Sequence, residues 1–141
     1  MTIDAIQEEI VEELNFMDNT NDKNDYVLDL GKELAPMNED HKTEATFIHG
    51  CQSKAWIHST LNEAGNMIFT AFSDSLYSKG MIALILRIFE KQTPENILKA
   101  DLFFMDKVGL STFVSQKRTG GMAAMIDKIK LDAAKALTYK G

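Results

Sequence analysis

The stretch KAWIHSTLNEAGNMIFTAFS, residues 54–73, decides the fold. Apolar and polar side chains alternate along residues 54–62 and again along 67–73, and this period of two is typical of a strand with two different faces. Between the two runs, residues 63–66 have the composition of a turn. The stretch therefore predicts an antiparallel hairpin. The short β-type segment before it is expected to add a third strand through Phe47 and Ile48.

Helical signals flank the hairpin on both sides. Apolar residues recur at spacings of three and four, and polar caps or Pro94 mark where helices begin. The predicted helices cover residues 3–17, 22–34, 75–91, a short segment that starts at Pro94, 102–108 and 119–138. This order predicts one α+β domain over residues 1–141, with a small antiparallel three-stranded sheet and helices packed on one of its faces.

The composition narrows the classes of function. The chain has 141 residues, of which 45% are hydrophobic, so it can bury one core. The net charge of −6 argues against nonspecific nucleic-acid binding, which requires basic charge. Residues 1–44 hold 13 acidic and 3 basic side chains, whereas residues 115–141 hold 6 basic and 2 acidic ones. These ends are interpreted as solvated helix faces, or alternatively as a docking surface for a protein partner.

Nothing in the sequence predicts a membrane partner. The longest apolar run covers only residues 81–86 and ends at Arg87, whereas a spanning helix needs roughly 20 apolar residues. The N-terminal segment is acidic and amphipathic, unlike a signal peptide. A free cysteine in such a chain fits a reducing compartment, so we expect a cytoplasmic protein.

Cys51 is the only thiol and the leading candidate for chemistry. It follows Gly50 at a break between two β-type segments, and reactive groups often lie on such loops. Gln52 and Ser53 add donors that would stabilise a sulfur anion. From its position alone, Cys51 is equally interpreted as a small buried apolar residue. A nucleophile pair of Cys51 with His49 is a further alternative.

Other candidate sites have weaker patterns. A single cysteine excludes an intrachain disulfide and any cluster site that needs several thiolates of this chain. The three histidines are eight and nine residues apart, which is not a metal-ligand spacing on a helix. Gly120 and Gly121 after Arg118 suit either an anion-binding helix start or a plain turn.

The stretch IHGCQSKAW, residues 48–56, resembles the signature of the SufE family of sulfur acceptors, the iron–sulfur metabolism associated domain. Three further stretches also resemble that family in the expected order. They are residues 26–36, residues 73–80 with Asp74 and Lys79, and residues 115–125 with Arg118. The resemblance covers roughly residues 5–137.

The resemblance implies a fold similar to that of the cluster scaffold proteins, and a role as sulfur carrier. A SufS-type cysteine desulfurase, which uses pyridoxal phosphate, would pass persulfide sulfur to Cys51, and an iron–sulfur scaffold would receive it. The chain itself would need no cofactor and no metal. We expect it to stimulate the desulfurase, and to be a monomer or weak homodimer. Gly50, Gln52, Ser53, Asp74, Lys79 and Arg118 are the implied supporting residues.

Sulfur transfer is attack by a thiolate on the outer sulfur of a persulfide, so the ionised fraction of the thiol matters. Lys54, Lys79 and Arg118 are the basic residues that would raise this fraction if they lie close to the thiol. Trp56 and Phe47 would form an apolar wall that shelters the persulfide. Two alternatives stay open: a regulatory module that binds the desulfurase without carrying sulfur, and a hydrolase that uses Cys51 and His49.

Overall fold

The computed structural model describes residues 1–110 and 120–140. Its sheet is the predicted hairpin, formed by β1 (Ala55–Leu61) and β2 (Met67–Ser73). The strands pair antiparallel, from Ala55 opposite Ser73 to Leu61 opposite Met67. Every second residue of β2 is buried, as expected for a strand with one face on a core. The hairpin prediction is therefore confirmed, including both strand ranges to within one residue.

The predicted third strand is wrong. Within the described residues the sheet has two strands, and Phe47 forms only an isolated bridge with Trp56. The Thr46 side chain explains the short run, because its hydroxyl donates to the carbonyl oxygen of His41 at 2.5 Å and curls the chain just before Phe47. Gly50 then turns the chain at the other end, with φ of +99°. Too few extended residues remain between these two points to form a strand.

Side-chain caps set the helix starts. Thr2, Asn19, Ser75 and Thr93 each accept a hydrogen bond from a backbone N–H in the first turn of the helix that follows. Because Asn19 is such a cap, the second helix begins at Thr20 rather than at the predicted residue 22. The helices are α1 (Ile3–Asn15), α2 (Thr20–Glu33), the 3₁₀ turn η1 (Glu39–His41), α3 (Leu76–Phe89), α4 (Pro94–Lys99), α5 (Phe104–Lys107) and α7 (Gly121–Lys140).

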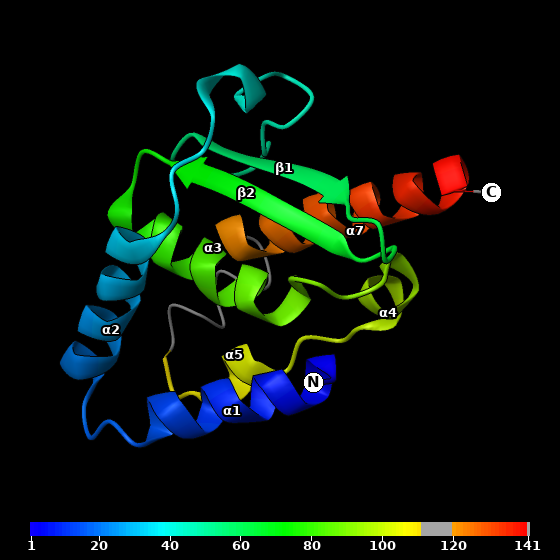
Figure 1. Cartoon of the computed structure of the whole chain (residues 1–141). Coiled ribbons are helices and arrows are strands. Elements are labelled where there is room, and N and C mark those ends of the chain that lie inside the picture. The colour runs from blue at the N-terminus through cyan, green and yellow to red at the C-terminus, as the bar shows by residue number, and fades with distance from the viewer. Residues whose placement is uncertain (111–119, 141) are drawn as a thin grey trace.

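The elements form layers (Figure 1). The hairpin lies on α3 and α7, with β2 against α3 and β1 against α7. On the other side of α3 lie α1 and α5, and α2 flanks the same helix. The segment that contains η1 passes over the outer face of the hairpin, where His41 stacks on His58 with ring centroids 3.9 Å apart. Helices therefore pack on one face of the sheet, as predicted, and an irregular segment covers part of the other.

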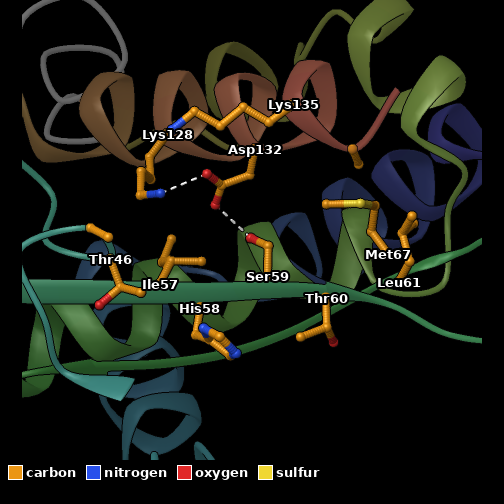
Figure 2. A pocket seen from close by; sticks show the side chains of 12 residues that line it. Thr46, Ile57, His58, Ser59, Thr60, Leu61, Met67, Lys128, Asp132 and Lys135 are labelled. Carbon is orange, nitrogen blue, oxygen red and sulfur yellow. Dashed lines mark hydrogen bonds and ion pairs between the residues drawn. The ribbon is translucent and has the colours of Figure 1, made fainter. Parts of the chain in front are cut away.

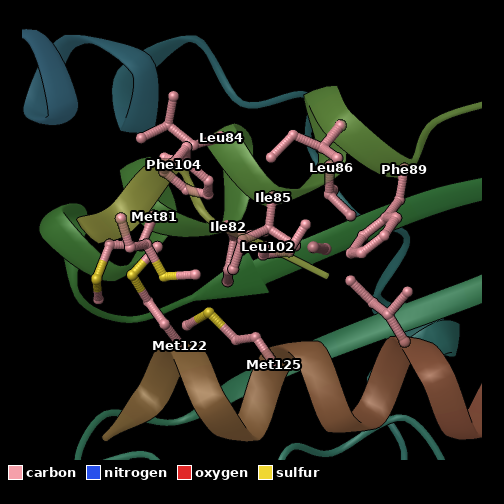
Figure 3. Packing of buried hydrophobic residues seen from close by; sticks show 14 of the residues in the cluster. Met81, Ile82, Leu84, Ile85, Leu86, Phe89, Leu102, Phe104, Met122 and Met125 are labelled. Carbon is pink, nitrogen blue, oxygen red and sulfur yellow. The ribbon is translucent and has the colours of Figure 1, made fainter. Parts of the chain in front are cut away.

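Helix α3 is the centre of the core. Its buried side chains meet Met122 and Met125 of α7 on one side and Phe104 of α5 on the other (Figure 3). The close approach of α2 to α3 depends on two glycines. A Cβ atom at Gly80 would lie 2.0 Å from the carbonyl oxygen of Val27, and one at Gly31 would lie 2.4 Å from that of Leu76. Only glycine at both positions allows this packing.

Among residues 1–110 and 120–140, no helix combines the length and the apolar character that crossing a membrane takes.

Candidate functional site

Cys51 lies on a loop whose base is fastened on both sides. At one side, the Ile48 N–H donates to the carbonyl oxygen of Ala55 at 2.8 Å. At the other, Asp74 makes two hydrogen bonds with Lys54: its Oδ1 accepts from the Lys54 N–H at 3.1 Å, and its own N–H donates to the Lys54 carbonyl at 3.1 Å. Residues 49–54 therefore form a loop held at both ends between the Phe47 bridge and β1.

Gly50 determines how the loop approaches α7. Its φ of +99° lies in the region that favours glycine. A Cβ atom at this position would also lie 3.4 Å from the Cβ of Ala124. The loop thus turns at Gly50 against the first turns of α7, and this turn directs the next residue toward the interior. The role of Gly50 as a supporting residue stays a prediction, and the structure gives its backbone angle and its place against Ala124.

The Cys51 thiol is half-buried and packs against the hydrophobic core. Its sulfur lies 3.8 Å from the carbonyl oxygen of Gly121, to which the thiol donates a weak hydrogen bond. Burial raises the pKa of the Cys51 thiol. A protonated, sheltered thiol is therefore the resting form, and only a small fraction is ionised at neutral pH.

Two of the three basic residues expected beside the thiol, Lys54 and Lys79, are described, and neither acts on the pKa of the thiol. Burial is the cause of the Cys51 pKa shift, with no opposing cation among the described residues. The Lys79 ammonium lies 4.7 Å from the centroid of the Phe72 ring, on the outer face of the hairpin. Lys54 is exposed and joins Asp74 through its backbone. Arg118 lies outside the described residues.

A small polar cavity of about 420 Å³ lies beside the loop. Gln52 and Ser53 contribute to its lining from the loop, together with Ser75, Tyr77, Ser78, Met81 and the glycines 50, 120 and 121. Several of these side chains carry hydroxyl or amide groups that donate hydrogen bonds. The structure thus places Gln52 and Ser53 at the lining of one cavity, and their role as donors to the Cys51 sulfur stays a prediction.

The predicted apolar wall has a different location. The Trp56 ring packs on Phe47 at 5.6 Å and on Phe72 at 6.2 Å between centroids, on the outer face of the hairpin. The apolar surroundings of the thiol come instead from the core beneath it. Likewise, His49 is exposed and pairs with Glu44 at 2.9 Å, rather than with the thiol. No Cys–His pair is present among the described residues, so His49 is not placed as the base that the hydrolase alternative assigned to it.

In the described ranges, no group of three or more His, Cys, Asp or Glu side chains is placed to hold a metal ion.

Sequence reasoning missed a polar cluster between the inner face of β1 and helix α7. Ser59 Oγ donates to Asp132 Oδ2 at 2.6 Å, and the Lys128 ammonium donates to Asp132 Oδ1 at 2.6 Å. The signal was Ser59 itself, a polar residue in the alternation position that Ile57 and Leu61 occupy on the inner face. Lys128 and Asp132 are four residues apart on α7, a spacing equally typical of an exposed ion pair.

Comparisons with known proteins agree with this architecture. The family model SufE, described as an Fe–S metabolism associated domain, matches residues 8–133. An uncharacterized SufE-like protein of Rhizobium meliloti is 32% identical over 130 residues, which are 89% of this chain and 93% of that protein. A hypothetical protein of Thermus thermophilus, solved in solution, has a similar fold, with a TM-score of 0.75 and 20% identity over 94% of this chain and 96% of that one. The chain therefore belongs to the SufE family of Fe–S metabolism associated domains.

Proposed function

We propose that this chain is a sulfur carrier that accepts persulfide sulfur on Cys51 from a SufS-type cysteine desulfurase and passes it to an iron–sulfur scaffold. The observation that supports this most is the placement of the single thiol. Cys51 lies on a loop held at its base by hydrogen bonds, and its thiol is half-buried and hydrogen-bonded to the start of α7. Family membership supplies the link to iron–sulfur metabolism.

The proposed step is a thiol exchange. The Cys51 thiolate attacks the outer sulfur of the persulfide on the desulfurase cysteine, and the bond between the two sulfurs of that persulfide breaks. The desulfurase cysteine leaves as a thiolate, and Cys51 now carries the persulfide. No electron is gained or lost overall. Because the desulfurase is cleared of its sulfur, its turnover of L-cysteine rises, and pyridoxal phosphate is needed only by that partner.

The resting thiol is poorly ionised, so the desulfurase would have to promote its ionisation. Its active site would provide the cation or the base that ionises Cys51, after the hydrogen bond to Gly121 is released. This order protects the thiol between deliveries, because a buried protonated thiol reacts slowly with oxidants. A free thiol that works in this way suits a reducing compartment, so we propose the cytosol. A monomer or weak homodimer leaves the loop accessible.

The test is mass spectrometry of the full chain after incubation with a cysteine desulfurase and L-cysteine. We expect the fragment that holds Cys51 to gain the mass of one sulfur atom, and desulfurase turnover to rise. Cys51→Ser should abolish both effects. A double variant, Cys51→Ser with Ser53→Cys, keeps one thiol on the same loop. It should restore neither the sulfur gain nor the desulfurase turnover to the level of the parent. If Cys51→Ser still stimulates the desulfurase, the chain is a regulatory module and the carrier proposal fails.

A further inference from the structure

A second cavity, of about 340 Å³, lies between the inner face of β1 and helix α7 (Figure 2). Ile57 and Ser59 point from β1 toward α7, whereas His58 and Thr60 point to the other side of the strand. The cavity shares no lining residue with the polar cavity beside the Cys51 loop. A groove of about 630 Å³, lined in part by His49 and Gly50 of the Cys51 loop, shares Ala45, Lys128 and Lys135 with this cavity. The proposed sulfur transfer itself gives the inner face of β1 no role.

One part of this cavity is apolar. Ile57 and Met67 are almost completely buried, and the side chains of Leu61, Ala45 and Ala136 complete that part of the lining. A volume of 340 Å³ is at the lower end of the range for small-molecule pockets, about 300–1,000 Å³. The apolar part is thus suited to a short hydrocarbon chain.

The other part is an ion pair that is nearly removed from solvent. The side chains of Lys128 and Asp132 are 12% and 11% exposed, and their charged groups lie 2.6 Å apart. Both carboxylate oxygens of Asp132 are occupied, one by Lys128 and the other by the Ser59 hydroxyl. A buried ion pair gives little net stability over an apolar pair of the same size, because two charges must lose their hydration. Stability alone is a weak reason for this arrangement.

The Lys128 ammonium keeps unused donors, whereas each carboxylate oxygen of Asp132 already accepts a hydrogen bond. An ammonium has three N–H donors, and in the described ranges Lys128 uses one of them, for Asp132. Lys135, two helical turns along α7, lines the same cavity. Two lysines and one aspartate give this lining a net positive charge. An anionic head group would take the remaining donors of Lys128, whose position Asp132 and Ser59 hold.

We propose that this cavity binds a small amphipathic anion of the medium-chain carboxylate class. The carboxylate lies at the Lys128 ammonium, and the hydrocarbon chain lies against Ile57, Leu61 and Met67. Charge and shape both select this class: a cation would be repelled by the lysines, and a neutral head group would form no ion pair with them.

The experiment is an NMR titration of the full chain with octanoate, with octanol and octylamine as matched neutral and cationic probes. Octanoate should give saturable shifts confined to the residues that line the cavity, on β1, α7, the start of β2 and residues 45–46. Octanol should bind at least about tenfold more weakly, since its neutral hydroxyl can accept from the ammonium but forms no ion pair with it. Octylamine should cause no saturable shift. Equal affinity for octanol and octanoate, or shifts elsewhere, would overturn the proposal.

Variants test the role of Lys128 directly. Lys128→Met should weaken octanoate binding about tenfold or more, while Lys32→Met, an exposed lysine on α2, should leave it unchanged. Lys128→Met alone leaves Asp132 buried without its cation and is at risk of unfolding. The double variant Lys128→Met with Asp132→Leu removes both charges and should stay folded, yet lose octanoate binding by the same factor. Unchanged binding in this folded double variant contradicts the proposal. Because binding is measured without the desulfurase, the result is independent of whether Cys51 carries sulfur.

Discussion

The Cys51 sulfur lies 3.8 Å from the carbonyl oxygen of Gly121, the first residue of α7. This contact joins the only thiol of the chain to a residue 70 positions away, and it makes the thiol a donor in a half-buried setting. Burial raises the pKa of the thiol, so its ionised form is disfavoured in the isolated protein. Reactivity of Cys51 is therefore restrained by the fold itself.

The restraint predicts slow alkylation. In the folded chain, iodoacetamide should modify Cys51 more slowly at neutral pH than in the urea-unfolded chain, because the thiolate is the nucleophile. The midpoint of the rise in alkylation rate with pH should also lie at a higher pH in the folded chain than in the unfolded chain. The measurement is the alkylation rate against pH, with the unfolded chain as its control. A midpoint below that of the unfolded thiol would contradict a burial-raised pKa.

Asp74 is predicted to control the mobility of the Cys51 loop. Its Oδ1 accepts the Lys54 N–H at 3.1 Å, so Asp74→Ala removes an acceptor at the base of the loop. We expect a loss of about 0.5–1.5 kcal/mol in the free energy of unfolding, and faster alkylation of Cys51. Asp74→Asn keeps an oxygen at this position and should restore both properties. If alanine and asparagine behave alike, the hydrogen bond does not hold the loop.

Gly50 is predicted to be required for its backbone angle rather than for space. Gly50→Ala places a side chain at φ of +99° and 3.4 Å from the Ala124 Cβ. We expect destabilisation of about 1 kcal/mol or more in urea unfolding. The double variant Gly50→Ala with Ala124→Gly removes the contact with the Ala124 Cβ but keeps the backbone strain, so it should not regain the stability of the parent. Recovery would show that crowding against α7, not the backbone angle, is the constraint.

The hairpin was predictable because alternation is a local consequence of having two different faces. The absence of a third strand was not predictable, because it depends on a turn at Thr46, whose hydroxyl donates to the His41 carbonyl oxygen. Cys51 was identifiable as the only thiol, yet its partner Gly121 is distant in sequence. The Lys128–Asp132 spacing is equally typical of solvated pairs, and only the packing of β1 on α7 shows that the pair is nearly buried.

The contact between α2 and α3 gives a prediction about the core. Gly80→Ala would place a Cβ atom 2.0 Å from the Val27 carbonyl oxygen, a backbone atom that cannot move without shifting the helix. We expect a loss of about 3 kcal/mol or more, measured by urea unfolding. Ala83→Gly in the same helix is the control for general helix effects and should cost only about 1 kcal/mol. A Gly80→Ala variant as stable as the parent would mean that the helices separate easily.

His58 gives a prediction about pH. Burial, followed by the stacked His41, lowers the pKa of His58, with Lys128 acting in the same direction and Asp132 against it. The unfolded chain therefore takes up a proton at a higher pH than the folded chain does, so stability falls as the pH drops below the ordinary histidine value. Replacing His58 with glutamine removes this group from the titration. The free energy of unfolding of His58→Gln should then change less than that of the parent between about pH 7.5 and 5.5.

Matched measurements separate this effect from other acid-dependent groups. His49→Gln changes an exposed ring and should leave the loss of stability between these pH values in place. The pKa of Glu13 is lowered by its hydrogen bond to Arg87, so the stability from that pair is lost only as the pH falls below the ordinary range of a glutamate. Acid sensitivity near pH 6 that persists in His58→Gln would place its source elsewhere than at the outer face of β1.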